Sequence, residues 1–417
     1  MIKNIASSFA ARLAVMAITL AVVVMNAQVL GGSGQGLASL IQFGILLLVS
    51  VSSYIGGGAV VYLIPRTGAR PLLAPVYLSS ALVALLFYPL LRWLDLIDAY
   101  LIVHVCILGW LQSVFTFHLQ VLVGHERIQR YNLAVTAQSA SLALALVIVY
   151  FVFNEATIVA YLIALYVSFG LTLLVSALAV KKVWETKQNL GFSEAWKALW
   201  RYGKYGQTGN VFQLLTYRSP MYFLEKLMAH GLAAAGIFSI AFYAAEAVWS
   251  VGKSLSLVQH ARIANSTDTA SNKALTLGML VLSTSASVVL VTAALIVPEN
   301  LYLAVFGDDM KGLSLALLGL APGIIANGAS VIVAHHFSGT GQHRINTYGS
   351  AAGFGALLVF IYPLIEHYGI HGAALAASIG YSFQFCVLFW VFVSLEDVKK
   401  TDWKAGLNAM KALFKLN

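Results

Sequence analysis

Charged residues are scarce in this sequence. Asp, Glu, Lys and Arg account for 10% of its 417 residues, whereas they make up about a quarter of an ordinary soluble domain. Cysteine is rarer still, and Cys106 and Cys386 both lie inside apolar stretches, where cysteine behaves as a small hydrophobic residue. The composition therefore excludes a soluble domain, a disordered chain and a disulfide scaffold. The sequence also contains no G-x-x-x-x-G-K-[ST] phosphate loop, so nothing in it indicates an ATP-driven enzyme.

Hydrophobic residues are abundant instead, at 60% of the chain and a mean hydropathy of +0.83. Apolar runs of about twenty residues recur throughout, each long enough to cross a hydrocarbon core of about 30 Å as a helix. The runs are unbroken rather than alternating, which excludes an outer-membrane barrel. The sequence predicts an all-α integral membrane protein with twelve transmembrane helices. We expect them at residues 9–30, 37–64, 72–94, 99–123, 132–153, 157–180, 207–229, 232–260, 274–297, 312–336, 345–366 and 370–395.

The distribution of Lys and Arg predicts the orientation. Of the 25 such residues, only Arg92 and Lys311 fall on the side opposite the amino terminus, and Arg218, Lys226 and Lys253 lie within spans. All the others lie in segments on the same side as the amino terminus, and basic residues in short loops mark the cytoplasmic side. We therefore expect both termini to be cytoplasmic. The formal charge of +9 is then a consequence of membrane topology and does not point to nucleic acid.

A repeated motif suggests two similar halves. Residues 124–131 and 341–348 both read G-x-x-R-I-[QN]-x-Y, and each follows the fourth predicted helix of its half. Because each half has an even number of spans, the halves share one orientation and are expected to be related by a pseudo-twofold axis along the membrane normal. Two such six-helix lobes leave a cleft between them, which is the architecture of a transporter. We predict lobes at 1–180 and 207–395, a cytoplasmic linker at 181–206 and a basic tail at 396–417.

The linker and the tail are both amphipathic. In the linker, an apolar stripe among lysines and arginines consists of Phe192, Trp196, Leu199 and Trp200, and in the tail the stripe consists of Trp403, Leu407, Met410 and Phe414. Helices of this kind lie on anionic membrane surfaces with their apolar face in the lipid. We expect both segments to be anchors on the inner leaflet.

Ionisable residues inside the predicted spans cluster in the seventh and eighth helices. An ionised side chain at the centre of a spanning helix costs about 2.5–3.5 kcal/mol on insertion scales, so each one indicates a partner or an aqueous cavity. These residues are Arg218, Glu225, Lys226, Glu246 and Lys253. One interpretation is structural, with Arg218 paired to Glu246, and Glu225 paired to Lys226 or Lys253. The other is functional, with Arg218, Lys226 and Lys253 binding an anionic substrate and Glu225 and Glu246 serving charge coupling.

Histidines offer a weaker signal. His335 and His336 lie near the end of the tenth predicted span, where they could relay protons or serve an acyltransferase, although no second catalytic residue accompanies them. No pair of histidines has the spacing of a metal site with a third ligand nearby. We therefore expect no metal and no cofactor.

Several segments resemble polysaccharide flippases of the multidrug/oligosaccharidyl-lipid/polysaccharide (MOP) exporter superfamily, the Wzx type. The likeness covers most of the second half of the chain and is weaker in the first. It rests on WRYGKYG at 200–206, GN at 209–210, TYR at 216–218, AGIFSIA at 235–241, PG at 322–323, GTGQ at 339–342 and YGIHGAALA at 368–376.

The resemblance implies a MATE-like fold, alternating access, and export of a lipid-linked oligosaccharide across the bacterial inner membrane. It also implies that Arg218 matches a basic position facing the central cavity. The substrate would be an undecaprenyl-pyrophosphate-linked repeat unit for O-antigen, capsule or exopolysaccharide assembly. Arg127 and Arg344, at the cytoplasmic rims of the two lobes, would capture its head or lock the inward gate, unless they only mark the cytoplasmic side.

Two alternatives stay open. A cation-coupled multidrug exporter of the same superfamily would depend on Glu225 or Glu246, but such exporters usually carry an acidic residue in the first helix, where this chain has Asn26 and Gln28. A glycan-modifying acyltransferase would use His335 or His336. Further expected partners are the membrane lipids, H⁺ or Na⁺ as a coupling ion, and the polysaccharide polymerase machinery.

Overall fold

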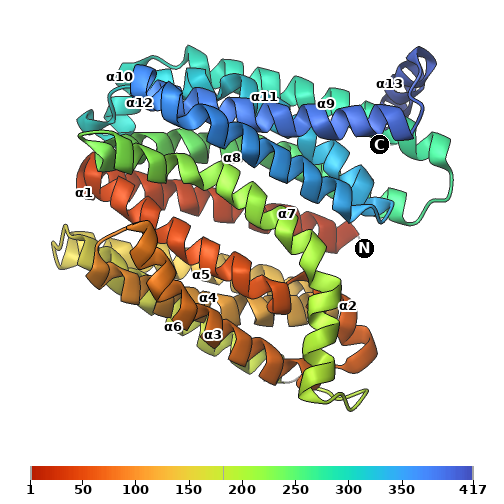
Figure 1. Ribbon diagram of the computed structural model, residues 1–417, viewed down its shortest axis with the longest axis horizontal. Helices are drawn as coiled ribbons and strands as arrows, with labels where there is room; N and C mark the ends of the chain where they lie inside the picture. The colour runs from red at the N-terminus through yellow and green to blue at the C-terminus, as the bar shows by residue number, and fades with distance from the viewer. Residues whose placement is uncertain (1, 182, 416–417) are drawn as a thin grey trace. The chain divides into compact units, whose positions relative to one another are not determined.

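The computed structural model describes residues 2–181 and 183–415, with side chains placed for residues 10–181 and 183–408 (Figure 1). It divides into two compact units, Met1–Val211 and Phe212–Asn417. All of the regular secondary structure described is helical. The first unit contains α1 (Ile2–Gly56), α2 (Gly58–Thr67), α3 (Arg70–Leu94), α4 (Ala99–Gly124), α5 (Ile128–Val147), the π-helix η1 (Ile148–Val152), α6 (Ile158–Lys181) and the start of α7 (Phe192–Leu227).

The second unit contains the end of α7 and all later helices. These are α8 (Gly231–Ala264), α9 (Thr269–Ile296), α10 (Glu299–Phe306), the 3₁₀-helix η2 (Asp308–Met310), α11 (Leu313–Gly339), α12 (His343–Leu395) and α13 (Lys400–Lys415). The sequence prediction of an all-α membrane fold is confirmed by this architecture.

Nine helices in the described part of the chain are long and apolar enough to cross a membrane. Two of these stretches each contain a pair of predicted spans: Ala10–Thr67, which comprises most of α1 together with α2, and His343–Leu395, which is α12. In both, the helix continues past a single non-helical glycine, Gly31 (φ 67°) in α1 and Gly369 (φ 55°) in α12. Only glycine adopts such positive φ values readily, so these residues interrupt the helix where the sequence predicted a boundary. α7 is too polar to be among the nine. The count of twelve spans stays a prediction.

α7 joins two segments that the sequence analysis treated separately. The predicted linker helix and the predicted seventh span form one continuous helix. Close packing of this helix on α1 depends on Gly203, where a Cβ atom would lie 2.5 Å from the carbonyl oxygen of Tyr54. Hydrogen bonds add to the contact, from the Gln207 amide to the carbonyl oxygen of Ser50 (2.8 Å) and between the Tyr54 and Thr208 hydroxyls (2.8 Å).

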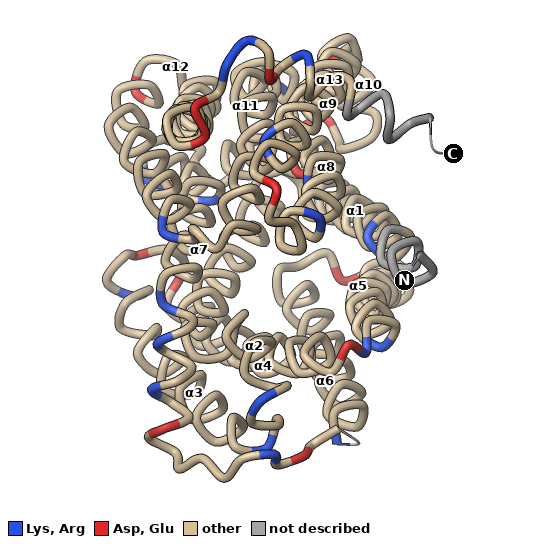
Figure 2. Tube along the Cα trace, turned by 90° about the vertical axis from the view of Figure 1, so that its right-hand side faces the viewer, with Lys and Arg blue, Asp and Glu red and all other residues tan. Residues whose placement is uncertain are grey.

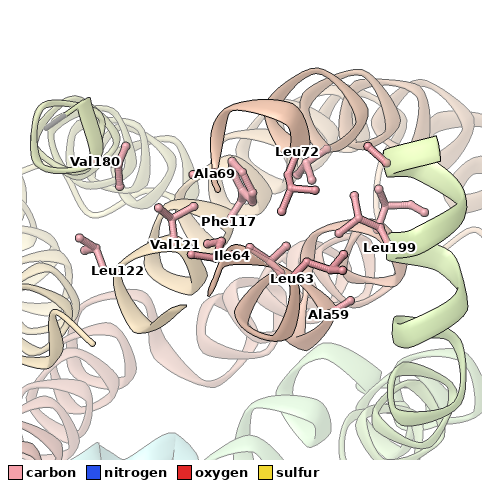
Figure 3. Close-up of a cluster of buried hydrophobic side chains, with 14 residues drawn as sticks. Ala59, Leu63, Ile64, Ala69, Leu72, Phe117, Val121, Leu122, Val180 and Leu199 are labelled. Carbon is pink, nitrogen blue, oxygen red and sulfur yellow. The ribbon is translucent and has the colours of Figure 1, made fainter. Parts of the chain in front are cut away.

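The apolar stripe of the linker packs against the first unit. Ala195 and Leu199 are fully buried in a cluster with side chains of α2, α3, α4 and α6. Figure 3 shows Leu199 on α7 beside Leu63 and Leu72 of this cluster. Trp196 and Trp200 stack on each other with ring centroids 6.0 Å apart, and Trp200 also stacks on Tyr54 of α1 (5.4 Å). Both tryptophans stay partly exposed. The linker is therefore part of the first unit's core as well as a candidate for membrane contact.

The tail helix α13 packs on α9 within the second unit. Trp403 contacts Phe389 (centroids 6.4 Å apart), and the Lys273 ammonium forms an ion pair with Asp402 (2.9 Å). The apolar stripe of the tail therefore contacts protein at Trp403. The side chains of Met410 and Phe414 lie outside the described residues.

Charged residues in both units gather at helix ends and connections, and long stretches of helix carry none (Figure 2). Several of the charged residues that lie inside long helices are on α7 and α8.

Candidate functional site

Arg218 is the most deeply buried charged residue of the predicted site. It lies on α7, two residues before Pro220, and its side chain is 7% exposed. Its Nη2 atom lies 3.2 Å from Oε2 of Glu246 on α8, and the Glu246 side chain is 36% exposed. A guanidinium removed from water needs such a partner, because an unpaired buried charge is strongly destabilising. The pair therefore joins a buried cation to a carboxylate at the margin of the unit.

Two aromatic rings of α8 complete the surroundings of the guanidinium. The Arg218 Cζ atom lies 4.2 Å from the ring centroid of Phe242 and 5.0 Å from that of Tyr243. Both rings lie within one helical turn of Glu246, and residues three and four apart share a helix face. Cation–π attraction adds about 0.5–2 kcal/mol at such distances. One turn and a half of α8 thus supplies the carboxylate and both rings.

A cluster of aromatic residues lies next to Arg218. Tyr217 stacks on Trp249 with centroids 4.9 Å apart, and Tyr381 of α12 meets the edges or faces of both rings at 5.3 and 5.4 Å. Asn327 of α11 hydrogen-bonds the Tyr217 hydroxyl (2.8 Å), and the Trp249 indole N–H donates to the carbonyl oxygen of Ile324 (3.0 Å). The polar atoms of Tyr217 and Trp249 are therefore satisfied by protein.

Three other polar atoms in this neighbourhood are buried and have no hydrogen-bond partner among the described residues. They are Nη1 of Arg218, the Ser219 hydroxyl and the Tyr381 hydroxyl. Leaving a buried donor unpaired costs about 1–3 kcal/mol, so native proteins rarely do so without a functional reason. All three atoms can donate, which suits an anion with several acceptor oxygens.

Glu225 and Lys226 form an ion pair with each other, with Oε2 and Nζ 3.1 Å apart at the end of α7. Lys253 is exposed and forms no ion pair with any described residue. Arg218–Glu246 and Glu225–Lys226 are the two contacts that the structural interpretation of the sequence predicted. Lys226 and Lys253 are not among the residues that contact the Arg218 guanidinium.

Arg127 and Arg344 are both exposed, but they differ in their place in the turn. Arg127 is the residue before α5, whereas Arg344 is the second residue of α12. In both turns a residue with positive φ, Glu126 or Gly341, precedes a backbone N–H that donates to a carbonyl oxygen five residues earlier. The two hydrogen bonds run from Arg127 to Leu122 and from Gln342 to Phe337. The structural repeat is therefore offset by two residues from the sequence motif.

The two histidines considered for catalysis serve helix contacts. His336 lies between the Thr276 hydroxyl (2.9 Å) and the Glu396 carboxylate (3.1 Å), and Nδ1 of His335 lies 2.8 Å from the carbonyl oxygen of Val331. No group of three or more His, Cys, Asp or Glu residues in the described part of the chain is arranged to hold a metal ion.

Sequence reasoning missed part of this site. The search for ionisable residues inside apolar spans found Arg218 and Glu246, but not Phe242 or Tyr381. Phe242 carries no polar signal at all. Tyr381 could have been noticed as a hydroxyl in an apolar span, yet only the fold brings it from α12 to α7.

No protein-family model matches the chain, and no curated protein matches it by sequence. Solved structures do match. The lipid II flippase MurJ, in an inward closed conformation, superposes with a TM-score of 0.74 at 13% identity, covering 99% of this chain and 92% of that one. An inward-facing MATE-family multidrug resistance transporter of the MOP superfamily gives 0.70 at 13% identity, covering 93% and 98%. A MATE transporter of Vibrio cholerae gives 0.64 at 16% identity, covering 96% and 97%.

The chain has the fold of MOP superfamily transporters. These neighbours are described as transporters and a flippase rather than as enzymes. A multi-pass membrane protein follows from this fold together with the apolar helices. At these identities the likeness establishes the fold, and the substrate must be argued from the residues of this chain.

Proposed function

We propose that this protein is a flippase that moves a lipid-linked oligosaccharide from the cytoplasmic to the periplasmic leaflet of the bacterial inner membrane. The substrate class is an undecaprenyl-pyrophosphate-linked repeat unit used in O-antigen, capsule or exopolysaccharide assembly. The observation that carries the proposal is the buried Arg218 guanidinium with an unpaired Nη1 atom in an aromatic surrounding. The sequence resemblance to polysaccharide flippases supports the same substrate class.

The physical problem that such a protein solves is the charge of the head group. A diphosphate cannot enter hydrocarbon unaided, because burying an unpaired charge is prohibitively costly. Arg218 offers a fixed positive charge whose planar donors match phosphate oxygens. Next to the guanidinium, Tyr217 and Trp249 stack on each other and form an apolar surrounding that excludes water.

The remaining predicted residues have supporting roles in this proposal. Lys253, which is exposed and has no ion-pair partner among the described residues, attracts the anionic head, and Lys226 does so when Glu225 releases it. Arg127 and Arg344 bind the head at the cytoplasmic side or close the inward gate. Glu225 and Glu246 are the carboxylates available for coupling to H⁺ or Na⁺.

Alternating access between the two lobes is the proposed mechanism. The lobes are those expected from the sequence, at 1–180 and 207–395, with the linker at 181–206 and the tail at 396–417. Solved MATE transporters with this fold are described in both inward-facing and outward-facing conformations. Both termini are proposed to be cytoplasmic, and the polysaccharide polymerase machinery is proposed to receive the product.

A cation-coupled multidrug exporter is the second candidate, because MATE transporters share this fold. One observation weighs against it. Residues 13–65 contain no carboxylate, and Asn26 in α1 instead accepts a hydrogen bond from the Tyr150 hydroxyl (3.0 Å). A neutral amide already engaged in this way is a weak cation ligand compared with a carboxylate.

Complementation tests the proposal. A flippase-deficient strain that makes the matching glycan is given the wild-type chain, Arg218→Ala or Arg218→Lys at equal membrane abundance. We expect the wild type to restore surface glycan, Arg218→Ala to accumulate the lipid-linked unit, and Arg218→Lys to restore part of the glycan because it keeps the charge without the planar donors. A wild type that restores nothing but confers resistance to several drugs would favour the exporter. Normal transport by Arg218→Ala would leave a flippase possible but remove this site.

A further inference from the structure

Arg218 uses only part of its donor capacity in the structure. Nη2 contacts Oε2 of Glu246 at 3.2 Å, while the buried Nη1 atom has no hydrogen-bond partner among the described residues. A guanidinium presents parallel N–H groups that match a carboxylate or a phosphate through two bonds. The Glu246 carboxylate therefore leaves part of the hydrogen-bonding capacity of the guanidinium unused.

Tyr381 brings a second unpaired donor to the same neighbourhood. Its side chain is fully buried, its hydroxyl has no hydrogen-bond partner among the described residues, and its ring contacts that of Tyr217, the residue before Arg218. The hydroxyl and the guanidinium therefore belong to neighbouring side chains of one buried cluster. A carboxylate has two oxygens, whereas a diphosphate has enough oxygens to accept from both groups at once.

The two members of the ion pair differ in how easily they can leave. The Arg218 side chain is 7% exposed and packed between rings, but the Glu246 side chain is 36% exposed. A carboxylate at the margin regains most of its hydration when it moves outward, whereas a buried guanidinium does not. Glu246 is therefore the partner that can move away at the lower cost, while Arg218 stays in place.

We infer that Glu246 occupies, in this conformation, the place that a substrate phosphate takes on Arg218, and that the phosphate displaces it with Tyr381 as a second donor. This inference rests on the proposed function and names how its site is regulated. Exchange of one anion for another keeps Arg218 paired throughout, so the interior never holds an uncompensated charge. The site therefore stays closed by its own carboxylate until a phosphate arrives.

A binding measurement tests the exchange directly. The full-length protein in nanodiscs of zwitterionic lipid, which avoid competition from anionic lipids, is titrated with farnesyl pyrophosphate as a short-chain diphosphate probe. We expect Glu246→Gln to bind the probe about tenfold or more tightly than the wild type, because the competing charge is gone. Tyr381→Phe, which removes only the hydroxyl, is expected to weaken binding several-fold. Glu366→Gln serves as the matched control, since Glu366 is exposed on α12 of the same unit, and is expected to bind as the wild type does.

A second variant guards against misfolding of Glu246→Gln. In Glu246→Ala, added acetate is expected to take the place of the lost carboxylate and to weaken probe binding as its concentration rises. Wild type and Glu366→Ala are expected to show no such sensitivity. If acetate competes with the probe only in Glu246→Ala, the vacated carboxylate site on Arg218 is the site that the probe occupies.

The outcomes separate this inference from the proposed function. A folded Glu246→Gln protein that binds the probe no more tightly than the wild type, or a Glu246→Ala protein that is indifferent to acetate, would overturn the exchange. If complementation still depended on Arg218, the flippase would stand without it. If the wild type bound no probe and restored no glycan, both would fall.

Discussion

The two units differ in the charged residues that their long helices contain. In the first unit, residues 13–65, 71–91, 99–125, 131–154 and 156–180 contain no Asp, Glu, Lys or Arg. The second unit places Arg218, Glu225, Lys226, Glu246 and Lys253 on two consecutive helices. The five charged residues proposed for binding and coupling therefore all lie in the second unit.

Neutral pairs satisfy several polar side chains in the helices of the first unit. The Tyr150 hydroxyl donates to Asn26 (3.0 Å), Gln112 and Gln138 bond each other (2.7 and 3.3 Å), and His104 bonds Tyr166 (2.9 Å). Pairs of this kind fix helices in place without net charge. Around Arg218, by contrast, donors are left over. This contrast supports the proposal that the second unit carries the binding site.

The largest expected effect comes from removing the charge that distinguishes the units. Arg218→Ala is expected to abolish glycan export and to lower the free energy of unfolding by about 1–3 kcal/mol, because Glu246 loses its partner. The double substitution Arg218→Met with Glu246→Leu is expected to recover stability, since apolar residues often replace a buried pair without loss, but not export. Thermal unfolding and surface glycan measure the two effects separately. Export by the double variant would mean that the pair serves packing only.

A second prediction concerns a feature that the units share. In each unit a buried histidine of one helix bonds oxygens of two other segments. His118 bonds Tyr77 of α3 (2.6 Å) and Ser176 of α6 (2.8 Å), and His336 bonds Thr276 of α9 and Glu396, which directly follows α12. His118→Ala and His336→Ala are each expected to destabilise their own unit by about 2 kcal/mol, because buried partners are left unpaired. Peptide-resolved hydrogen exchange should show faster exchange in one unit for each variant. Faster exchange in both units from either variant would contradict the prediction that each histidine stabilises only its own unit.

Much of this comparison was accessible from sequence. Apolar runs placed the helices because spanning length and hydropathy are local properties, and Gly31 lies where one predicted span ends. The fusion of linker and span in α7 was missed, because charge and tryptophan between 193 and 204 resemble a surface helix whether or not the chain continues as a helix. The pairing of Arg218 with Glu246 was one of two interpretations. The approach of Tyr381 was beyond reach, since it depends on how α12 packs.

A smaller effect is expected at the contact of α7 with α1 in the first unit. A methyl group at Gly203 would lie 2.5 Å from a backbone oxygen, whereas one at Gly206 meets nothing within 4 Å. Gly203→Ala is therefore expected to destabilise the unit by about 1–2 kcal/mol, and Gly206→Ala, its matched control, to stabilise the helix by up to about 1 kcal/mol. Thermal unfolding of the two variants checks this. Equal unfolding temperatures would mean that the close approach is not maintained.

The smallest expected effect concerns the tail helix of the second unit. A hydrogen bond from the Lys399 backbone N–H, and then the Lys273 ammonium, hold the pKa of the Asp402 carboxyl below its usual value of 3.8. A lowered pKa means that this contribution to α13 docking is present above pH 3.8 and is lost as the pH falls through the folded-state pKa. Limited proteolysis of the tail as a function of pH should show this loss, and Asp402→Asn should remove the dependence. Pronounced release of the tail near neutral pH would contradict it.

The most direct test of the central claim is a reconstituted flipping assay. Proteoliposomes carrying a radiolabelled lipid-linked oligosaccharide are treated with a membrane-impermeant glycosidase, and the fraction of glycan cleaved is followed over time. With the wild-type protein we expect the cleaved fraction to rise beyond the share of substrate initially in the outer leaflet, until nearly all of the substrate is cleaved. With the stable Arg218→Met, Glu246→Leu variant it should stop at the outer-leaflet fraction. Full cleavage with that variant would show that the second unit's charge is not the head-group site.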